Sequence, residues 1–187
     1  VALAAGYEHS LALTSDGGLY AWGSNVAGEL GTGSPSDSHV PVAVDTSGVL
    51  SGKTIVQIQA GWGTSAVLDS AGQVYTWGAA GTLGNGASSG STVPVAVDVS
   101  GVLSSKVVSK LSVGAYQMIV LTTDGMLFGL DNAPAADRLA IYNLAPPDTT
   151  PYDPSQGGSV GTYSTTGTSA DSGEIGRASC RERVSSP

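Results

Sequence analysis

Charged side chains are scarce in this chain of 187 residues, and basic ones are the scarcest. Asp, Glu, Lys and Arg make up 12% of the sequence, and the formal net charge is −8. Residues 1–133 hold nine acidic side chains and three lysines, a net charge of −6. Nucleic acids and anionic membranes are bound through clusters of Lys and Arg. We therefore expect neither as a direct partner.

Cysteine and long apolar runs are also missing. The single cysteine, Cys180, excludes a disulfide framework and a zinc site built from cysteines. No apolar run approaches the ~20 residues that a membrane-spanning helix needs, so we expect no membrane insertion. The sequence contains neither an HExxH motif nor a DxDxDG calcium loop. We predict no metal, no cofactor and no catalytic residues.

Glycine, in contrast, is abundant, with 27 residues. Each glycine inside a helix costs ~1 kcal/mol relative to alanine, so this composition favours an all-β chain with many tight turns. Many of the glycines belong to a repeat. The segment 6–33, GYEHSLALTSDGGLYAWGSNVAGELGTG, returns at 61–86 as GWGTSAVLDSAGQVYTWGAAGTLGNG, and in part at 114–129 as GAYQMIVLTTDGMLFG.

Four strand-like runs make up the first copy, and the second copy repeats them. In the first copy they are Val1–Gly6, His9–Thr14, Leu19–Gly23 and Val40–Asp45. The sequence SDGG between the second and third runs is typical of a hairpin turn. Pro41 cannot donate to a β-ladder, which predicts an edge position for the fourth run. A unit of ~50 residues with four strands is typical of a β-propeller blade.

The repeat resembles that of the regulator-of-chromosome-condensation family. The residues that carry the resemblance are Gly6, His9-Ser10-Leu11-Ala12-Leu13, Asp16-Gly17, Leu19-Tyr20, Trp22-Gly23, Asn25, Gly28, Leu30-Gly31 and Gly33. The resemblance implies a partial propeller arc of about two and a half blades over residues 1–133. The family's complete fold has seven blades, so we expect the missing blades in the full-length chain. We also expect the arc alone to be marginally stable, because repeats bury their cores against neighbours.

The connector at 46–53 resembles that of bacterial members of this family, which are often secreted or displayed on the cell surface. This favours an extracellular or cell-surface location. Residues 134–145 are predicted to be an irregular transition with one short strand at 139–142. Residues 146–187 are rich in Pro, Gly, Ser and Thr, which predicts a disordered tail. Within it, residues 173–184 (GEIGRASCRERV) are either a charged native tail or non-native read-through, and both interpretations leave Cys180 without a role.

Comparison of the copies separates constant from variable positions. His9 is replaced by Thr64 in the second copy and by Gln117 in the third. A general base cannot be exchanged for Thr or Gln, so we interpret His9 as a hydrogen-bonding residue of the fold. The glycine-rich runs at 28–33 and 81–86 lack the Lys-Ser/Thr pair and the helix of a P-loop, so we interpret them as turns.

An aromatic residue recurs late in each copy. Trp22 and Trp77 share one repeat position, and we expect Phe128 to take it in the third copy as part of the blade core. The positions predicted to be structural are Gly6, His9, Trp22, Gly23, Gly31, Gly61, Trp77, Gly78, Gly84, Gly114 and Phe128.

The turn after the first glycine of each copy varies in sequence. It reads Tyr7-Glu8 in the first copy, Trp62-Gly63 in the second and Ala115-Tyr116 in the third. Because this turn joins two strands, we expect it at a rim of the arc, where Trp and Tyr are typical interface anchors. The alternative is that these rings only pack on the neighbouring turn. The predicted partner-binding residues are Tyr7, Glu8, Trp62 and Tyr116, with the loops 34–39 and 88–91 as further candidates.

These observations favour a non-catalytic scaffold that binds another protein through its rim loops. The family resemblance implies two alternatives: guanine-nucleotide exchange on a small GTPase, and inhibition of a secreted enzyme. Exchange needs a structure that displaces nucleotide and magnesium, and no insertion of that kind interrupts the repeats. The sequence does not identify the partner.

Overall fold

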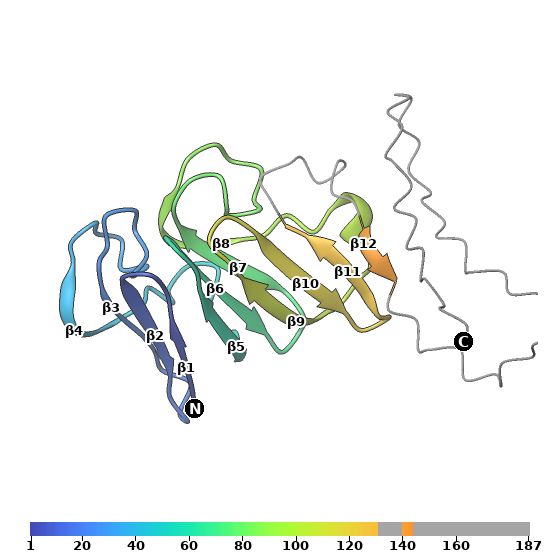
Figure 1. The fold of residues 1–187 in the computed structure, drawn as a ribbon. Coiled ribbons are helices and arrows are strands. Elements are labelled where there is room, and N and C mark those ends of the chain that lie inside the picture. The colour runs from blue at the N-terminus through green and yellow to red at the C-terminus, as the bar shows by residue number, and fades with distance from the viewer. Residues whose placement is uncertain (131–139, 144–187) are drawn as a thin grey trace, which may run out of the picture. The chain divides into compact units, whose positions relative to one another are not determined.

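A computed structural model of the chain describes residues 1–130 and 140–143, and it contains three antiparallel sheets of four strands each (Figure 1). The first sheet holds β1 (Ala2–Ala5), β2 (His9–Leu13), β3 (Leu19–Gly23) and β4 (Ser38–Ala43). The second holds β5 (Ile55–Ala60), β6 (Thr64–Asp69), β7 (Val74–Gly78) and β8 (Ser91–Ala96). The third holds β9 (Val108–Val113), β10 (Met118–Thr122), β11 (Met126–Gly129) and β12 (Ala140–Asn143).

Each sheet, with its loops, is one blade in which the strands pair in chain order. This confirms the prediction of an all-β arc of four-stranded blades. Pro41 lies in β4, an edge strand, where its missing N–H breaks no ladder. The one helical segment of the described residues is a 3-10 turn at Gly101–Leu103. The described residues therefore contain no helix that is long and apolar enough to cross a membrane. The tail predicted to be disordered, 146–187, lies outside the described residues.

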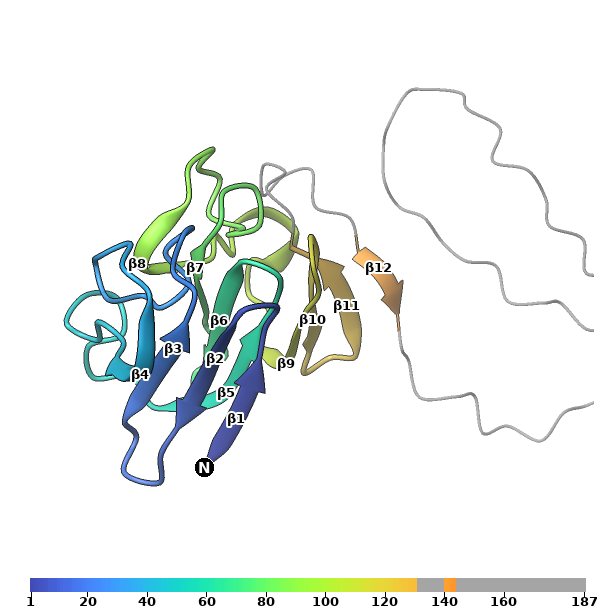
Figure 2. The ribbon, with the colours of Figure 1, turned by 60° about the vertical axis from the view of Figure 1, so that its left-hand side comes forward.

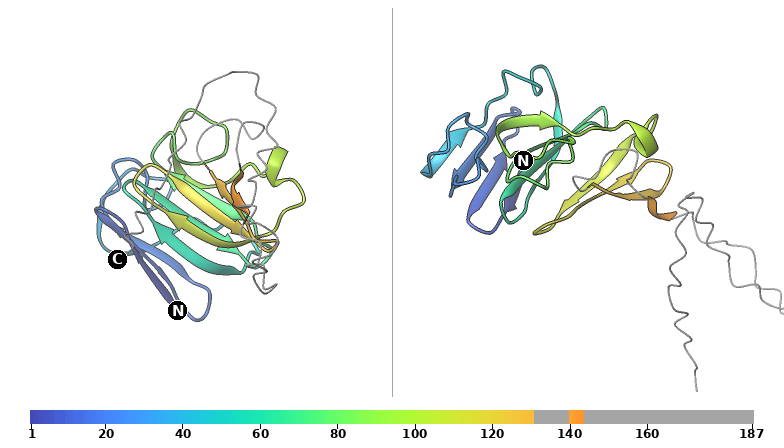
Figure 3. Two further views of the ribbon diagram at one scale, coloured as in Figure 1. Left: turned by 45° about the vertical axis from the view of Figure 1, so that its right-hand side comes forward. Right: turned by 90° about the horizontal axis from the view of Figure 1, so that it is seen from above.

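The blades follow one another side by side, so that β1 and β2 contact β5, and β5 and β6 contact β9 (Figures 2 and 3). One apolar cluster joins blade 1 to blade 2, with Leu11 and Leu19 packed among Val67, Tyr75 and Trp77. A second cluster joins blade 2 to blade 3 and includes Val74, Val120 and Phe128. Side chains alternate between the faces of a strand. Strand β7 therefore supplies both clusters, and all of its residues are buried.

Among the described residues, only one face of blade 1 is covered by a neighbouring blade. Leu19 and Ala21 of β3 point toward blade 2, so Tyr20 and Trp22 lie on the opposite face. Trp77 is fully buried, whereas Trp22, at the same repeat position, is only partly buried. The expectation that both indoles are blade core is therefore wrong for Trp22, because no described neighbour covers its face of the sheet.

The strand register corrects the expected position of Phe128. In blade 2, Tyr75 pairs with Val67; in blade 3, Phe128 pairs with Val120, which is the residue equivalent to Val67. Phe128 therefore occupies the Tyr75 position. The tryptophan position of blade 3 is taken by Leu130, which is 1% exposed and whose N–H bonds to the carbonyl of Met118. Aligning Phe128 with Trp77 because both are aromatic shifts the third copy by two residues relative to the second. The strand pairing needs no such shift, and it gives the hairpin between the second and third strands the same length in both blades.

Candidate functional site at the turn end of the blades

The turns β1–β2, β5–β6 and β9–β10 lie at one end of the blades, which we call the turn end. Here the backbones of neighbouring blades touch, because the Tyr7 N–H donates to the Gly61 carbonyl at 3.1 Å. A Cβ built on Gly6 would lie 2.5 Å from that carbonyl oxygen, and one built on Gly61 would collide with the carbonyl of Gly114. Only glycine permits this approach, and the approach brings the three variable turns together.

Three aromatic side chains, one from each blade, stack along the turn end. The ring centroids of Tyr7 and Trp62 are 6.2 Å apart, and those of Trp62 and Tyr116 are 5.4 Å apart, with tilts of 54° and 56°. These are favourable aromatic geometries. The rings remain open to solvent, since Tyr7 is 69%, Trp62 49% and Tyr116 67% exposed. We call these three residues the aromatic ladder; its rings both pack on neighbouring turns and present a surface.

A buried hydrogen-bond chain joins blades 1 and 2 near these turns. The hydroxyl of Ser65 donates to the backbone carbonyl of Glu29 at 2.7 Å, and the indole N–H of Trp77 donates to the same oxygen at 2.7 Å. Nε2 of His9 lies 2.9 Å from the Ser65 hydroxyl oxygen. Because that hydroxyl donates onward, His9 is the donor and its proton is on Nε2. We call these four residues the junction network.

Burial at the blade junction keeps His9 uncharged. His9 is 4% exposed, and burial lowers the pKa of its imidazole from 6.5 to about 4. The ring also packs on Gly6, where a Cβ would lie 2.7 Å from Nδ1. A neutral imidazole that donates one hydrogen bond across a blade junction has a structural task. This geometry agrees with the interpretation of His9 drawn from its Thr64 and Gln117 counterparts.

Glu29 is a residue that the sequence reasoning did not single out. It is 7% exposed, and its Oε2 accepts the N–H of Ala27 at 2.9 Å. Its other oxygen, Oε1, would lie 3.7 Å from a Cβ built on Gly63, the residue directly after Trp62. The available signal was variation within the glycine-rich loop, because Glu29 corresponds to Thr82 in the second copy.

The remaining residues predicted to bind a partner are Glu8 and the loops 34–39 and 88–91. Glu8 is exposed, and its backbone carbonyl accepts the N–H of Ser24. In the loop 34–39, the carboxylate of Asp37 accepts the N–H of Asn25 at 2.7 Å. In the range 88–91, Ser91 begins β8.

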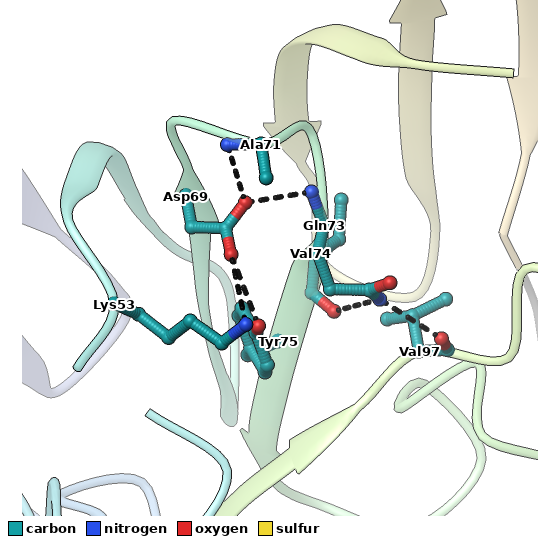
Figure 4. Close-up of polar contacts among 7 residues, drawn as sticks. All are labelled: Lys53, Asp69, Ala71, Gln73, Val74, Tyr75 and Val97. Carbon is teal, nitrogen blue, oxygen red and sulfur yellow. Dashed lines mark hydrogen bonds and ion pairs between the residues drawn. The ribbon is translucent and has the colours of Figure 1, made fainter. Parts of the chain in front are cut away.

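The opposite end of blade 2 is closed by its own hydrogen bonds (Figure 4). Oδ1 of the buried Asp69 accepts the N–H groups of Ala71 at 2.9 Å and Gln73 at 2.8 Å, and Oδ2 accepts the Tyr75 hydroxyl at 3.0 Å. Burial, followed by the bond to Asp69, raises the pKa of Tyr75 to about 12. The ammonium of Lys53 is 3.9 Å from Oδ2. These contacts stabilise the β6–β7 hairpin, and both carboxylate oxygens of Asp69 have partners within the protein.

Within the described ranges, no group of three or more His, Cys, Asp or Glu side chains is arranged to hold a metal ion. The candidate site among these residues is the exposed aromatic ladder. Glu8 follows Tyr7 in the chain, and Glu29 lies next to Gly63.

Two sequence profiles of one family match the repeats. Both are described as the regulator of chromosome condensation (RCC1) repeat; one matches residues 16–68, the other residues 1–29 and 55–84. Over 129 residues, 68% of this chain, the sequence is 35% identical to the ultraviolet-B receptor UVR8 of Arabidopsis thaliana, of which it covers 28%. It is also 35% identical over 133 residues to human E3 ubiquitin-protein ligase HERC2, of which it covers 3%.

Solved structures show the same architecture. Human WBSCR16 superposes with a TM-score of 0.62 at 26% identity, over 69% of this chain and 32% of that one. Prp20p from Saccharomyces cerevisiae superposes with a TM-score of 0.56 at 18% identity, over 70% of this chain and 32% of that one. The strand order, the repeat profiles and these likenesses agree: residues 1–84 match the regulator of chromosome condensation (RCC1) repeat, and the blades share the architecture of these solved structures.

Proposed function

We propose that this chain is a non-catalytic scaffold that binds a protein partner at the turn end, with the aromatic ladder at the centre of the contact. The observation that carries the proposal is the position of Tyr7, Trp62 and Tyr116. They lie in contact with one another on three successive blades, and each is about half exposed or more. Exposed contiguous aromatic surface is unfavourable in water, and Trp and Tyr are the residues most often central to protein interfaces.

The frame beneath the ladder supports this role. The junction network and the close approach at Gly61 hold the turns of blades 1 and 2 in one arrangement. Rings on a rigid frame lose little conformational entropy when a partner covers them, which favours affinity. The solved structure of Prp20p is described with its binding to Gsp1p and histones, both of them proteins. This is consistent with a protein partner.

The test uses the complete chain, immobilised, to capture partners that are identified and then purified. Binding of the purified partner is measured by calorimetry with wild type, Trp62→Ala and Tyr116→Ala. We expect each substitution to weaken binding by more than about tenfold, as for central aromatic anchors. Tyr20→Ala is the matched control, since Tyr20 is 36% exposed on β3, on the sheet face that points away from blade 2. Equal affinity of the ladder variants and wild type would refute the proposal.

A further inference from the structure

We propose that the aromatic ladder receives a cationic side chain, arginine or lysine, from the partner. This inference rests on the proposed function and specifies its chemistry. The first observation is charge. Among the described residues, the loops and turns of the turn end carry the carboxylates of Glu8, Glu29 and Asp37 and no Lys or Arg.

The lysines of the described residues lie elsewhere. Lys53 and Lys106 are in the connectors just before β5 and β9, at the opposite end of the blades, and Lys110 is within β9. Lys53 faces Asp69, and Lys106 forms an ion pair with Asp124. A positively charged partner segment therefore meets carboxylates that no Lys or Arg of the described turn-end residues opposes, and such complementarity steers association.

The second observation is the ladder itself. A cation is attracted to the face of an aromatic ring, most strongly to that of tryptophan. Trp62 is the middle ring, and its tilts toward Tyr7 and Tyr116 leave 49% of the residue open. A guanidinium or ammonium group placed there would contact Trp62 and at least one tyrosine ring.

The third observation is the carboxylate of Glu29, which is nearly buried. Its Oε2 is satisfied by Ala27, but Oε1 has no hydrogen-bond donor among the described residues. A buried acceptor without a donor is costly, so an incoming N–H group would be favoured there. Oε1 lies beside Gly63, directly after Trp62. Arginine suits both features best, because its planar group stacks on rings while its N–H groups bind carboxylate.

The experiment titrates acetylated tetra-arginine amide into the complete chain at low salt, with tetra-citrulline amide as the uncharged probe of similar shape. We expect binding of tetra-arginine and none of tetra-citrulline. Trp62→Ala should weaken binding by about two- to fivefold, and Glu29→Gln and Glu8→Gln should each weaken it. Asp45→Asn removes one partly exposed charge at the opposite end and should bind as wild type does. Circular dichroism checks that Glu29→Gln folds, and Glu8→Gln, on an exposed turn, provides the same test without a buried change.

Equal binding of the citrulline probe would overturn the cation proposal, and so would an Asp45→Asn loss as large as that of Glu29→Gln. The second would mean that overall negative charge, not this site, attracts the probe. If tetra-arginine fails to bind while a purified partner still requires Trp62 and Tyr116, the cation proposal is refuted and the proposed function is retained. If tetra-arginine binds through Trp62 and Glu29 but the affinity of the partner is unchanged by the ladder substitutions, the proposed function is refuted.

Discussion

Acid should loosen the junction between blades 1 and 2 by charging His9. The folded pKa of His9 is about 4 because the ring is buried, against an ordinary value of 6.5. Between these values the unfolded chain takes up a proton that the folded chain does not. The contribution to stability is therefore fully present above about pH 6.5 and is lost as the pH falls toward about 4.

The size of the effect follows from the two pKa values. In the steep part of the window the free energy of unfolding falls by about 1.4 kcal/mol per pH unit. Between about pH 7.5 and about pH 4.5 the expected loss from His9 alone is about 2–3 kcal/mol. This is a large fraction of the 5–15 kcal/mol, roughly, by which domains are stable.

The assay is urea unfolding followed by tryptophan fluorescence across this pH range, for wild type and His9→Gln. Glutamine is the natural residue of the third copy, at Gln117, and it can donate to Ser65 without titrating. We expect the variant to be less stable than wild type by about 1 kcal/mol at neutral pH. Its stability should change little down to about pH 4.5, so that the two curves converge and cross.

Other acidic groups act in a separate window. Side-chain hydrogen bonds lower the pKa values of Asp16, Asp45 and Asp124 below their ordinary 3.8. Their stabilising effect is present above 3.8 and is lost only below it, so they do not obscure the His9 range. Parallel loss of stability in wild type and His9→Gln between about pH 6.5 and about pH 4.5 would refute the assignment of the effect to His9.

Two further substitutions test the packing of the blades, both by urea unfolding. Trp77→Phe removes the indole hydrogen bond across the junction and leaves space in a fully buried site, so we expect a loss of about 1–3 kcal/mol; Trp22→Phe, on the uncovered face, should cost clearly less, and equal losses would contradict the difference in burial. Gly61→Ala places a methyl group against a carbonyl of blade 3 and should cost more than about 2 kcal/mol. Gly48→Ala, with no heavy atom within 4 Å of the new Cβ, is its control and should change stability by less than about 0.5 kcal/mol; a tolerated Gly61→Ala would mean that the blades can separate at this point.

The repeat could be predicted from the sequence because the residues that define its turns and strands are close together in the chain. The turn before Leu19 and the alternating strands depend on residues near one another in the chain, and the edge position of Pro41 follows from its missing N–H. Phe128 was misplaced because a two-residue shift aligned one aromatic with another. The pairing of Phe128 with Val120 corrected it, and pairing is a property of the hairpin, not of residue type. The burial of Trp22 was overestimated, because burial depends on whether a neighbouring blade covers the sheet face that carries the side chain.

The sequence alone determined the blade unit and the turns that vary within it, since glycine, hairpin and strand preferences act over a few residues. The variation at Tyr7, Trp62 and Tyr116 was also the basis for predicting a partner-binding surface there. Only the tertiary structure decided that these rings, more than 50 residues apart in the chain, form one ladder. It also placed the carboxylate of Glu29 next to Gly63. Contacts between blades join residues that no local pattern links, and their geometry is set by the glycine-permitted approach of one backbone to the next.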